Sequence, residues 1–400
     1  MLTITLKPGK EKSLLRRHPW VFASAIDRVD GKAEERNRLG ATALVQSSSG
    51  RFLARAAWSP HSQIRARVWT FDEREPVDHA LLKRRIQAAL DWRRQAVRDT
   101  DAVRIVFGEA DGLPGLVADW YGGTSGHLVC QFQSAGVEAW KSALVQALSA
   151  ATGCPNVYER SDASVRAREG LPSVTGVLAG AEPPAAIHIV ENGVRYAVDV
   201  RGGHKTGFYI DQRDNRQLVA DLAHERGVLN CFCYSGGFSL AALKGGARSV
   251  VSIDSAGDVL ALARRNAELN GFDPARAEWL DADVFKALRQ MREQGRSFDL
   301  IVLDPPKFAA SPGQVERAAR AYKDINLLGL QLLRPGGLLF TYSCSGAIGA
   351  DLFHKIVAGA ANDAGVDARI LRRLSAGADH PMTTAFPEGE YLKGLLLQKP

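Results

Sequence analysis

From about residue 187 the sequence alternates between short apolar runs and longer amphipathic stretches, and this pattern restricts the fold more than any other feature. Short apolar runs predict strands, whereas apolar residues at a 3.6-residue spacing predict helices. The predicted strands are 228–234, 249–254, 278–285, 298–304, 337–344 and 391–400, and a predicted helix follows each of the first five. Strands that are each followed by a helix favour a parallel, doubly wound α/β sheet of the Rossmann-like class.

Two regions with different patterns precede this one. Residues 1–70 contain short strands separated by turns and predict a small β-rich module. Residues 71–185 combine an amphipathic helix at 78–98 with further strands and predict a central α/β unit. The proline pair at 180–186 predicts a linker. The 400 residues are therefore expected to form three domains, at 1–70, 71–185 and 186–400.

Composition restricts the class of protein more than its activity. Hydrophobic residues make up 46% and charged residues 24%, as in globular proteins, and a net charge of +7 permits an anionic partner such as nucleic acid. Five cysteines are too sparse for a disulfide framework, and Cys231-Phe-Cys233 lacks C-x-x-C spacing, so no metal is expected. No signal peptide and no membrane-spanning run is evident, so we expect a cytoplasmic protein without a membrane partner.

A glycine pair follows the first of these strands, in NCFCYSGGFS. Gly236 and Gly237 open a helix, where glycine lets the backbone approach a ligand at the helix N-terminus. Asp254 ends the next strand, where an acid would meet ribose hydroxyls, so the pattern favours a nucleoside ligand. The alternative is a tight turn without a ligand. Asp283 ends the third strand, where it would either contact an adenine amino group or cap the following helix.

Two further strand ends carry candidate catalytic groups. The fourth strand ends in a D-P-P sequence that begins with Asp304, and its prolines stiffen the loop that presents this acid. The fifth strand ends at Cys344, in TYSCSG. A lone cysteine is usually a small core hydrophobe, but the carboxyl ends of parallel strands share one edge, which groups Cys344 with Tyr234, Asp254 and Asp304. A thiolate there could add to carbon 6 of a pyrimidine and activate carbon 5 for methylation.

The strand IRARVWT of the β-rich module carries Arg65 and Arg67 on one face, because strand side chains alternate. Two interpretations remain open from the pattern alone. The pair either belongs to a solvated face or forms a strip that contacts the phosphates of a nucleic acid.

Many of these segments together resemble one known family. They are GGHKTGFYIDQRDNR (202–216), VLNCFCYSGGF, LDPPKF, YKDINLL, FTYSCSG, DHPMTTAFPEGEYLKG, EKSLLRRHPWVF, SQIRARVWTF, GEADGLPGL and YERSDASVR. The combination covers nearly the whole chain and resembles the ribosomal RNA large subunit methyltransferase I family, which uses S-adenosylmethionine to methylate carbon 5 of a cytosine in 23S rRNA. The resemblance implies an N-terminal PUA domain, a central α/β domain of the RNA-methyltransferase type and a Rossmann-like class I catalytic domain. It also suggests a homodimer.

The resemblance assigns roles by position. Cys344 would be the attacking thiolate, and Asp304 would hold the cytosine. The implied cofactor-binding residues are Gln212, Tyr234, Gly236, Asp254, Asp283 and Asp304, and the implied RNA-binding residues are Arg65, Arg67 and Lys307. Lys307 stands where two-cysteine cytosine methyltransferases carry a second cysteine, so the base that removes the carbon-5 proton is unassigned. Glu388, Asp211 and a bound water are the alternatives.

Three other functions fit parts of the pattern. D-P-P loops also serve methylation of base nitrogens, including those of guanine, but nitrogen targets need no covalent nucleophile such as Cys344. A nicotinamide-dependent oxidoreductase would share the sheet, but the G-x-G-x-x-G sequence is absent. An RNA-binding assembly factor with a vestigial catalytic domain would not need the intact catalytic and cofactor set, which is Gly236, Asp254, Asp304 and Cys344.

Overall fold

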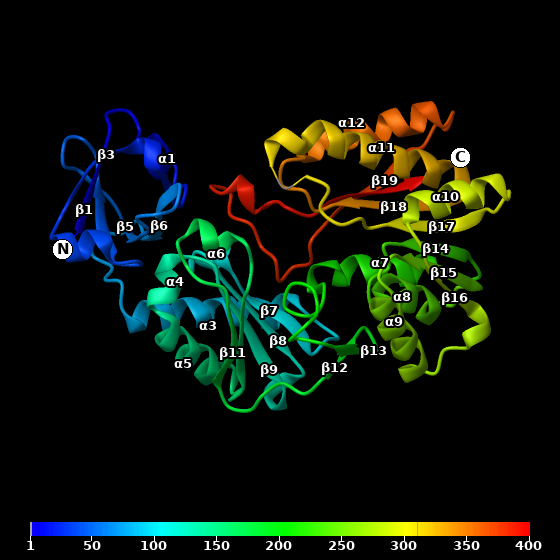
Figure 1. The fold of residues 1–400 in the computed structure, drawn as a ribbon, viewed down its shortest axis with the longest axis horizontal. Coiled ribbons are helices and arrows are strands. Elements are labelled where there is room, and N and C mark those ends of the chain that lie inside the picture. Colours follow the sequence, from blue (N-terminus) through cyan, green and yellow to red (C-terminus); the bar gives the residue numbers. More distant parts are fainter. Residues whose placement is uncertain (1, 310) are drawn as a thin grey trace. The chain divides into compact units, whose positions relative to one another are not determined.

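The computed structural model describes residues 2–309 and 311–400 (Figure 1). Within these residues the strands form sheets of six, five, two and seven strands. The chain divides into two compact units. The first extends to Val190 and also includes Val198–Ile210 and Ala378–Gly389, whereas the second comprises Glu191–Ala197, Asp211–Gly377 and Glu390–Pro400.

The six-stranded sheet belongs to the first unit and has the strand order β2-β6-β5-β4-β1-β3. Its elements are β1 (Leu2–Leu6), α1 (Lys12–Leu15), β2 (Trp20–Phe22), β3 (Ile26–Asp30), α2 (Ala33–Asn37), β4 (Thr42–Gln46), β5 (Phe52–Trp58) and β6 (Ile64–Thr70). Alternate residues of β1, namely Leu2, Ile4 and Leu6, are buried in its core beside Val45. The predicted β-rich N-terminal module is therefore confirmed.

A five-stranded sheet, also in the first unit, has the order β11-β10-β9-β8-β7. Its elements are α3 (His79–Ala96), β7 (Ala102–Phe107), β8 (Leu116–Tyr121), β9 (His127–Phe132), α4 (Ala135–Ala139), α5 (Lys141–Thr152), β10 (Val157–Ser161), α6 (Val165–Arg168) and β11 (Val174–Ala179). The predicted amphipathic helix is α3, whose N-cap Asp78 accepts a hydrogen bond from the Leu81 amide at 2.9 Å. Leu82, Ile86 and Leu90 of α3 are buried against the sheet, which confirms the predicted amphipathic pattern.

The hairpin predicted around Asn192 and Gly193 is present as β12 (Ile187–Glu191) and β13 (Val194–Val198). Both turn residues have positive φ, 49° at Asn192 and 75° at Gly193. Asparagine and glycine tolerate this left-handed conformation, which two-residue hairpin turns require.

The seven-stranded sheet lies in the second unit and has the order β16-β15-β14-β17-β18-β20-β19. Its strands are β14 (Gly227–Cys231), β15 (Ser249–Asp254), β16 (Ala277–Asp281), β17 (Phe298–Leu303), β18 (Leu333–Ser343), β19 (Arg369–Ser375) and β20 (Lys393–Gln398). Strands β14 to β18 are parallel, as predicted, so their carboxyl ends share one edge. Strand β20 is antiparallel to β18, and β19 is antiparallel to β20. We did not predict β19, because its sequence RILRRLS lacks an alternating apolar pattern and is almost fully exposed.

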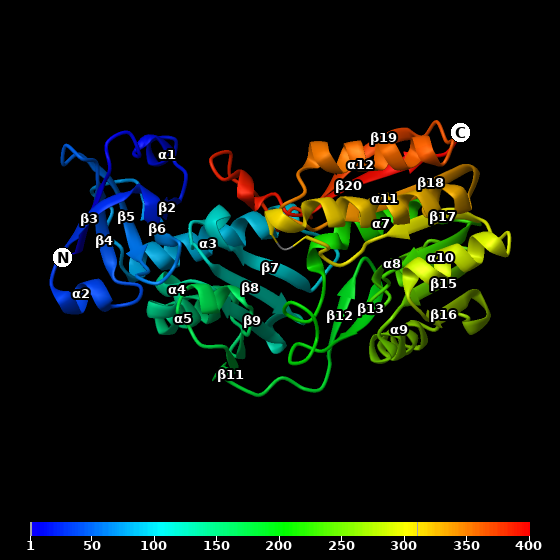
Figure 2. The same ribbon diagram turned by 45° about the horizontal axis from the view of Figure 1, so that its top comes forward.

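Helices cover both faces of this sheet (Figure 2). They are α7 (Arg213–Leu222), α8 (Gly237–Lys244), α9 (Gly257–Leu269), α10 (Val284–Glu293), α11 (Val315–Leu332) and α12 (Ala350–Asp363). Helices α10, α11 and α12 share one core with Ile301 and Leu303. Helices α7 and α8 share a second core with Leu300 and Tyr342 on the opposite face. The central strands β14 and β17 are buried on both faces, which explains their largely apolar sequences, whereas β16 lies at the edge of the sheet and is partly exposed.

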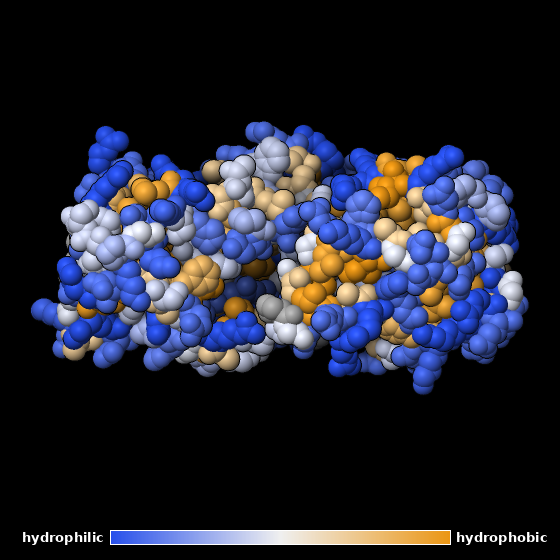
Figure 3. Space-filling model, turned by 90° about the horizontal axis from the view of Figure 1, so that it is seen from above, coloured by the Kyte–Doolittle hydropathy of each residue, from blue (hydrophilic) through white to orange (hydrophobic). Residues whose placement is uncertain are grey.

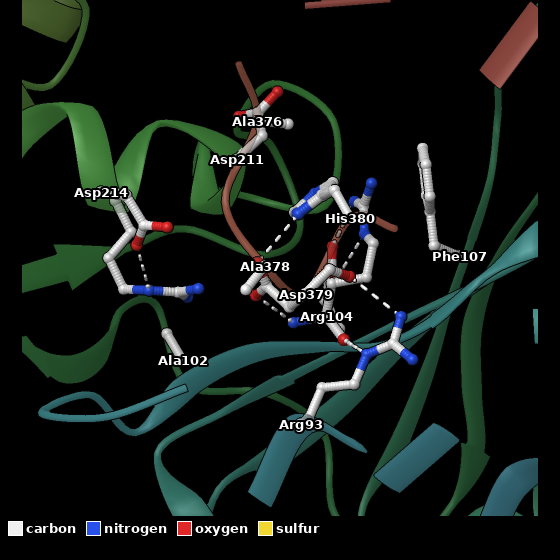
Figure 4. A network of polar contacts seen from close by, with 12 residues as sticks. Arg93, Ala102, Arg104, Phe107, Asp211, Asp214, Ala376, Ala378, Asp379 and His380 are labelled. Carbon is white, nitrogen blue, oxygen red and sulfur yellow. Dashed lines mark hydrogen bonds and ion pairs between the residues drawn. The ribbon is translucent and has the colours of Figure 1, made fainter. Parts of the chain in front are cut away.

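Residues Ala378–Gly389 pack within the first unit through a buried polar network (Figure 4). The Asp379 carboxylate is fully buried and accepts hydrogen bonds from the Arg104 amide at 3.1 Å and from His380 Nδ1 at 3.0 Å. Arg93 donates to the Asp379 carbonyl oxygen at 2.9 Å and pairs with Asp111 at 2.6 Å. These contacts satisfy the buried charges. The predicted boundaries at 1–70, 71–185 and 186–400 remain predictions.

The surface carries scattered apolar side chains among polar ones. The face seen in Figure 3 is largely hydrophilic, with separate hydrophobic patches. Large apolar side chains with exposed surface are Leu15, Phe22, Trp92, Val177, Val190, Ile370, Leu371 and Met382. Among the described helices, none has the length and hydrophobicity that a membrane crossing requires.

Candidate active site

The glycine turn after β14 contains residues in the left-handed region, with φ of 49° at Tyr234 and 86° at Gly236. A Cβ atom on Gly236 would lie 2.7 Å from Leu240 Cδ1 and 3.1 Å from Ala263 Cβ. Glycine is therefore required by the packing of the turn itself, as the tight-turn interpretation expects. Helix α8 begins directly after the turn, so its first amide groups face the same edge of the sheet. A contact between Gly236 and a cofactor remains a prediction.

Asp254 organises this turn from the end of β15. Its Oδ2 accepts a hydrogen bond from the Tyr234 amide at 2.9 Å, and its Oδ1 accepts one from the Ala256 amide at 3.2 Å. A carboxylate oxygen can accept more than one hydrogen bond, so Asp254 keeps the capacity to bind hydroxyl donors such as those of ribose.

Asp283 is the N-cap of α10, where its Oδ1 accepts a hydrogen bond from the Lys286 amide at 3.0 Å. The capping interpretation of Asp283 is therefore correct. The side chain is exposed near the end of β16, and the predicted contact with the adenine end of a cofactor stays a prediction.

The loops that carry the proposed acid and nucleophile are neighbours. Strands β17 and β18 pair in parallel with Leu303 beside Thr341, so Asp304 and Cys344 lie on adjacent loops at the same edge. The Cys344 thiol donates a weak hydrogen bond to the carbonyl oxygen of Pro305 at 3.9 Å. Sequence reasoning grouped these residues from strand order alone, and the structure brings them together.

Ser345 joins these two loops, although sequence analysis did not single it out. Its hydroxyl accepts a hydrogen bond from the Ala309 amide at 3.1 Å and lies 3.0 Å from the Tyr322 hydroxyl. The Tyr322 ring packs on Phe308 of the D-P-P loop, with centroids 4.8 Å apart. Burial raises the pKa of Tyr322, so its hydroxyl stays neutral and can donate. The only sequence signal for these residues was their place in FTYSCSG and YKDINLL.

Tyr342 lies beneath the same edge and is fully buried. Its ring stacks on Phe238 of α8, with centroids 5.7 Å apart, and its hydroxyl has no hydrogen-bond partner among the described residues. Burial, followed by the negative charge of Asp304, raises the pKa of Tyr342 well above its usual value, so the phenol stays neutral. Gly394 on β20 leaves room for the ring, because a Cβ there would lie 2.5 Å from Tyr342 Cδ1.

Cys344 differs from the other cysteines in being partly exposed. The remaining four are buried: Cys130, Cys154, Cys231 and Cys233. Burial raises the pKa of Cys130, Cys231 and Cys233, which keeps these thiols protonated and unreactive. The accessible cysteine is therefore the one at the carboxyl edge of the sheet.

Gln212 and Asp211 are both buried at the start of α7. Gln212 Oε1 accepts a hydrogen bond from Asn215 at 2.6 Å, whereas its Nε2 has no partner among the described residues. Asp211 Oδ2 accepts a hydrogen bond from the Tyr391 hydroxyl at 2.6 Å. The other candidate base, Glu388, belongs to the first unit and pairs with His18 at 3.2 Å.

Arg67 does not belong to an exposed strip, which corrects the expectation for β6. Its side chain is 9% exposed, pairs with Glu109 at 3.2 Å and Glu169 at 3.0 Å, and lies 5.3 Å from the Trp20 ring. The guanidinium group, which we expected to contact solvent or phosphate, instead contacts two carboxylates and an aromatic ring. Arg65 is half-buried and donates to the Pro60 carbonyl oxygen.

Lys307 of the D-P-P loop is exposed. Its assignment to RNA binding, like that of Arg65, stays a prediction. Among the described residues, no group of three or more His, Cys, Asp and Glu side chains is arranged to hold a metal ion.

Comparisons with known proteins give the class of this fold and site. Residues 105–386 match the model of an S-adenosylmethionine-dependent methyltransferase family, and residues 4–71 match a PUA-like domain. A solved structure, a candidate S-adenosylmethionine-dependent methyltransferase from Streptococcus mutans, matches with a TM-score of 0.84 at 23% identity over 100% of both chains. Another, a candidate methyltransferase complexed with S-adenosylhomocysteine, has a TM-score of 0.85 at 23% identity over 100% of both chains.

The chain is thus a methyltransferase that depends on S-adenosylmethionine. Curated relatives define it further. It is 52% identical to ribosomal RNA large subunit methyltransferase I of Aeromonas salmonicida, covering 99% of this chain and 98% of that protein. It is 49% identical to the protein of that name from Salmonella arizonae, covering 98% of this chain and 96% of the other. The chain belongs to the ribosomal RNA large subunit methyltransferase I family.

The residues at the carboxyl edge fit this cofactor. Asp254 offers acceptors for ribose hydroxyls, and the N-terminus of α8 offers amide donors beside Gly236. The Gln212 Nε2 group is a buried donor without a partner among the described residues. A buried donor of this kind is costly unless a ligand or water satisfies it.

Proposed function

We propose that this protein methylates carbon 5 of a cytosine in large-subunit (23S) ribosomal RNA, through a covalent bond between Cys344 and carbon 6 of the base. The large-subunit rRNA target is taken from the names of the curated relatives. The observation that carries the proposal is the partly exposed Cys344 thiol on a loop next to Asp304. We place the reaction in the cytoplasm.

Carbon 5 of cytosine is too weakly nucleophilic to take up a methyl group by itself. In this proposal Cys344 activates it by attacking carbon 6. The thiolate forms a bond to carbon 6, and the electron pair of the 5,6 double bond moves toward carbon 5 and the ring. S-adenosylmethionine, when bound, supplies the methyl group that this carbon takes up. A base then removes the carbon-5 proton, the 5,6 double bond reforms, and Cys344 leaves as the thiolate.

In this proposal Asp304 holds the cytosine ring. The two prolines that follow it restrict the loop, so the carboxyl group is fixed before the base arrives. It stabilises the charge that develops when the thiolate adds, by interaction with a ring nitrogen. The base that removes the carbon-5 proton is not assigned; Glu388, Asp211 and a bound water are the candidates.

The RNA partner also explains a group of exposed arginines on β19. Arg369, Arg372 and Arg373 form no ion pair with a carboxylate among the described residues, and Arg373 Nη2 lies 3.4 Å from His354 Nδ1. Strand β19 runs in the same direction as β18 and lies two strands from it, which is about 10 Å. A nucleic acid whose base reaches Cys344 would carry phosphates within reach of this strand and of Lys307 in the same unit. Arg65, in the first unit, is a separate proposed RNA contact.

The test is to map methylated nucleotides by mass in 23S rRNA from cells that lack this protein, with and without the purified enzyme. We expect one 5-methylcytosine to disappear and to be restored by the enzyme but not by Cys344→Ala. A methyl group restored on a guanine nitrogen instead would replace this proposal by the second candidate, which uses the same D-P-P loop. Sedimentation of the enzyme tests the suggested homodimer.

A further inference from the structure

Lys393 is a buried lysine behind the loop that carries Cys344. The residue is 5% exposed and lies on β20, where it pairs with Ser343 of β18. Its Nζ donates hydrogen bonds to the carbonyl oxygens of Ser345 at 2.9 Å and Ile348 at 2.7 Å. Ser345 follows Cys344 directly, so the ammonium group is anchored to the segment that presents the thiol.

This buried ammonium group forms no ion pair with a carboxylate among the described residues, although charged side chains are rarely buried without one. Burial lowers the pKa of Lys393, and the positive charge of Lys307 lowers it further. Glu390 and the Cys344 thiol act in the opposite direction and raise this pKa, which means that an anion at either position stabilises the ammonium form. Glu390 and Lys307 are both exposed, so solvent screens their charges.

We propose that Lys393 is a positioning residue that favours the thiolate form of Cys344 and fixes the loop on which it lies. The inference rests on the proposed function, because a thiolate is needed only if Cys344 is the nucleophile. The proton that leaves the thiol goes to solvent, and Lys393 keeps its own. A lysine beside a thiol is a known way to make a cysteine reactive near neutral pH.

The chain contains a matched control for this role. Lys399 lies just past the other end of β20 and donates to the carbonyl oxygens of Leu330 at 2.9 Å and Leu333 at 2.7 Å. Burial lowers the pKa of Lys399 as well. The two lysines therefore share their bonding pattern, but only Lys393 is anchored beside Cys344.

The test is the rate of alkylation by iodoacetamide as a function of pH, without RNA or cofactor. Cys344 dominates this rate because the other four cysteines are buried, and Cys344→Ala gives the background. We expect Lys393→Met to raise the midpoint of the titration by about one pH unit, a tenfold loss of thiolate at pH 7. Lys399→Met should leave the midpoint unchanged, and Lys393→Arg should keep it close to wild type.

An unchanged midpoint in folded Lys393→Met would overturn the inference. If that variant does not fold, Lys393→Gln decides, because it removes the charge and keeps N–H donors on a side chain that is one atom shorter. Failure of the proposed function gives a different result. In that case Cys344→Ala would still transfer methyl groups to rRNA, whatever the lysine variants do to the alkylation midpoint.

Discussion

The thiol of Cys344 lies 3.9 Å from the carbonyl oxygen of Pro305, which follows Asp304 directly. This contact joins the loops after β17 and β18, whose strands pair in parallel. It places a partly exposed cysteine beside a rigid acidic loop, an arrangement suited to covalent activation of a pyrimidine base.

We expect rRNA that contains 5-fluorocytidine at the target position to become covalently attached to the wild-type enzyme in the presence of S-adenosylmethionine. Fluorine at carbon 5 cannot be removed as a proton, so the thioether to Cys344 persists. The complex is detected as a band shift in a denaturing gel. Cys344→Ser should give no such band while retaining cofactor binding by calorimetry, and a stable adduct with that variant would exclude the cysteine as nucleophile.

Gly236→Ala should weaken S-adenosylmethionine binding by about tenfold, or 1.4 kcal/mol. The added Cβ would lie 2.7 Å from Leu240 Cδ1 at a φ of 86°, so the turn that begins α8 has to move. Calorimetric titration measures the effect. Gly271→Ala is the control, because Gly271 has a φ of 68° but no atom within 4 Å of the new Cβ. Equal cofactor affinity in both variants would show that the turn does not contact the cofactor.

Arg67→Ala should lower the free energy of unfolding by about 3–5 kcal/mol, because it leaves Glu109 and Glu169 buried without their shared cation. The shift of the denaturant midpoint, followed by tryptophan fluorescence, measures this loss. Arg28 is the control: it pairs with Asp30 at 3.0 Å on the surface, and Arg28→Ala should change stability by less than about 0.5 kcal/mol. A similar midpoint for both variants would contradict a structural role for Arg67.

Replacing Arg369, Arg372 and Arg373 together by alanine should weaken rRNA binding and flatten its dependence on salt. Each lost phosphate contact lowers the slope of log K against log salt concentration by about 0.7–0.9. Filter binding at several salt concentrations gives this slope. Arg296→Ala is the control, since Arg296 already pairs with Glu278 at 3.0 Å. If the wild-type protein and the triple variant give the same slope of log K against log salt concentration, the β19 arginines contact solvent and not RNA.

Some elements of the fold could be predicted from the sequence and others could not. The glycine turn, the strands β14 to β18 and the N-cap at Asp283 follow from local sequence, because turns, caps and buried parallel strands have specific residue requirements. Strand β19 was missed, because an exposed edge strand with three arginines carries no apolar period.

Arg67 shows why a residue pattern alone was insufficient for a charged side chain. In sequence it is one arginine of an alternating strand, whereas in the structure Glu109 and Glu169 reach it from 42 and 102 residues away. Long-range pairing of this kind has no local signature. The same holds for Tyr322, whose hydroxyl meets Ser345 from α11.

The sequence by itself determined the parallel α/β sheet, its carboxyl edge and the grouping of Asp254, Asp304 and Cys344 on that edge, since strand direction follows from the alternation of strands and helices. Only the tertiary structure decided which groups surround the thiol. Lys393 approaches the loop after Cys344 from a strand that begins 49 residues later along the chain and runs antiparallel to β18. Such proximity depends on chain reversal and packing, which local residue preferences do not encode.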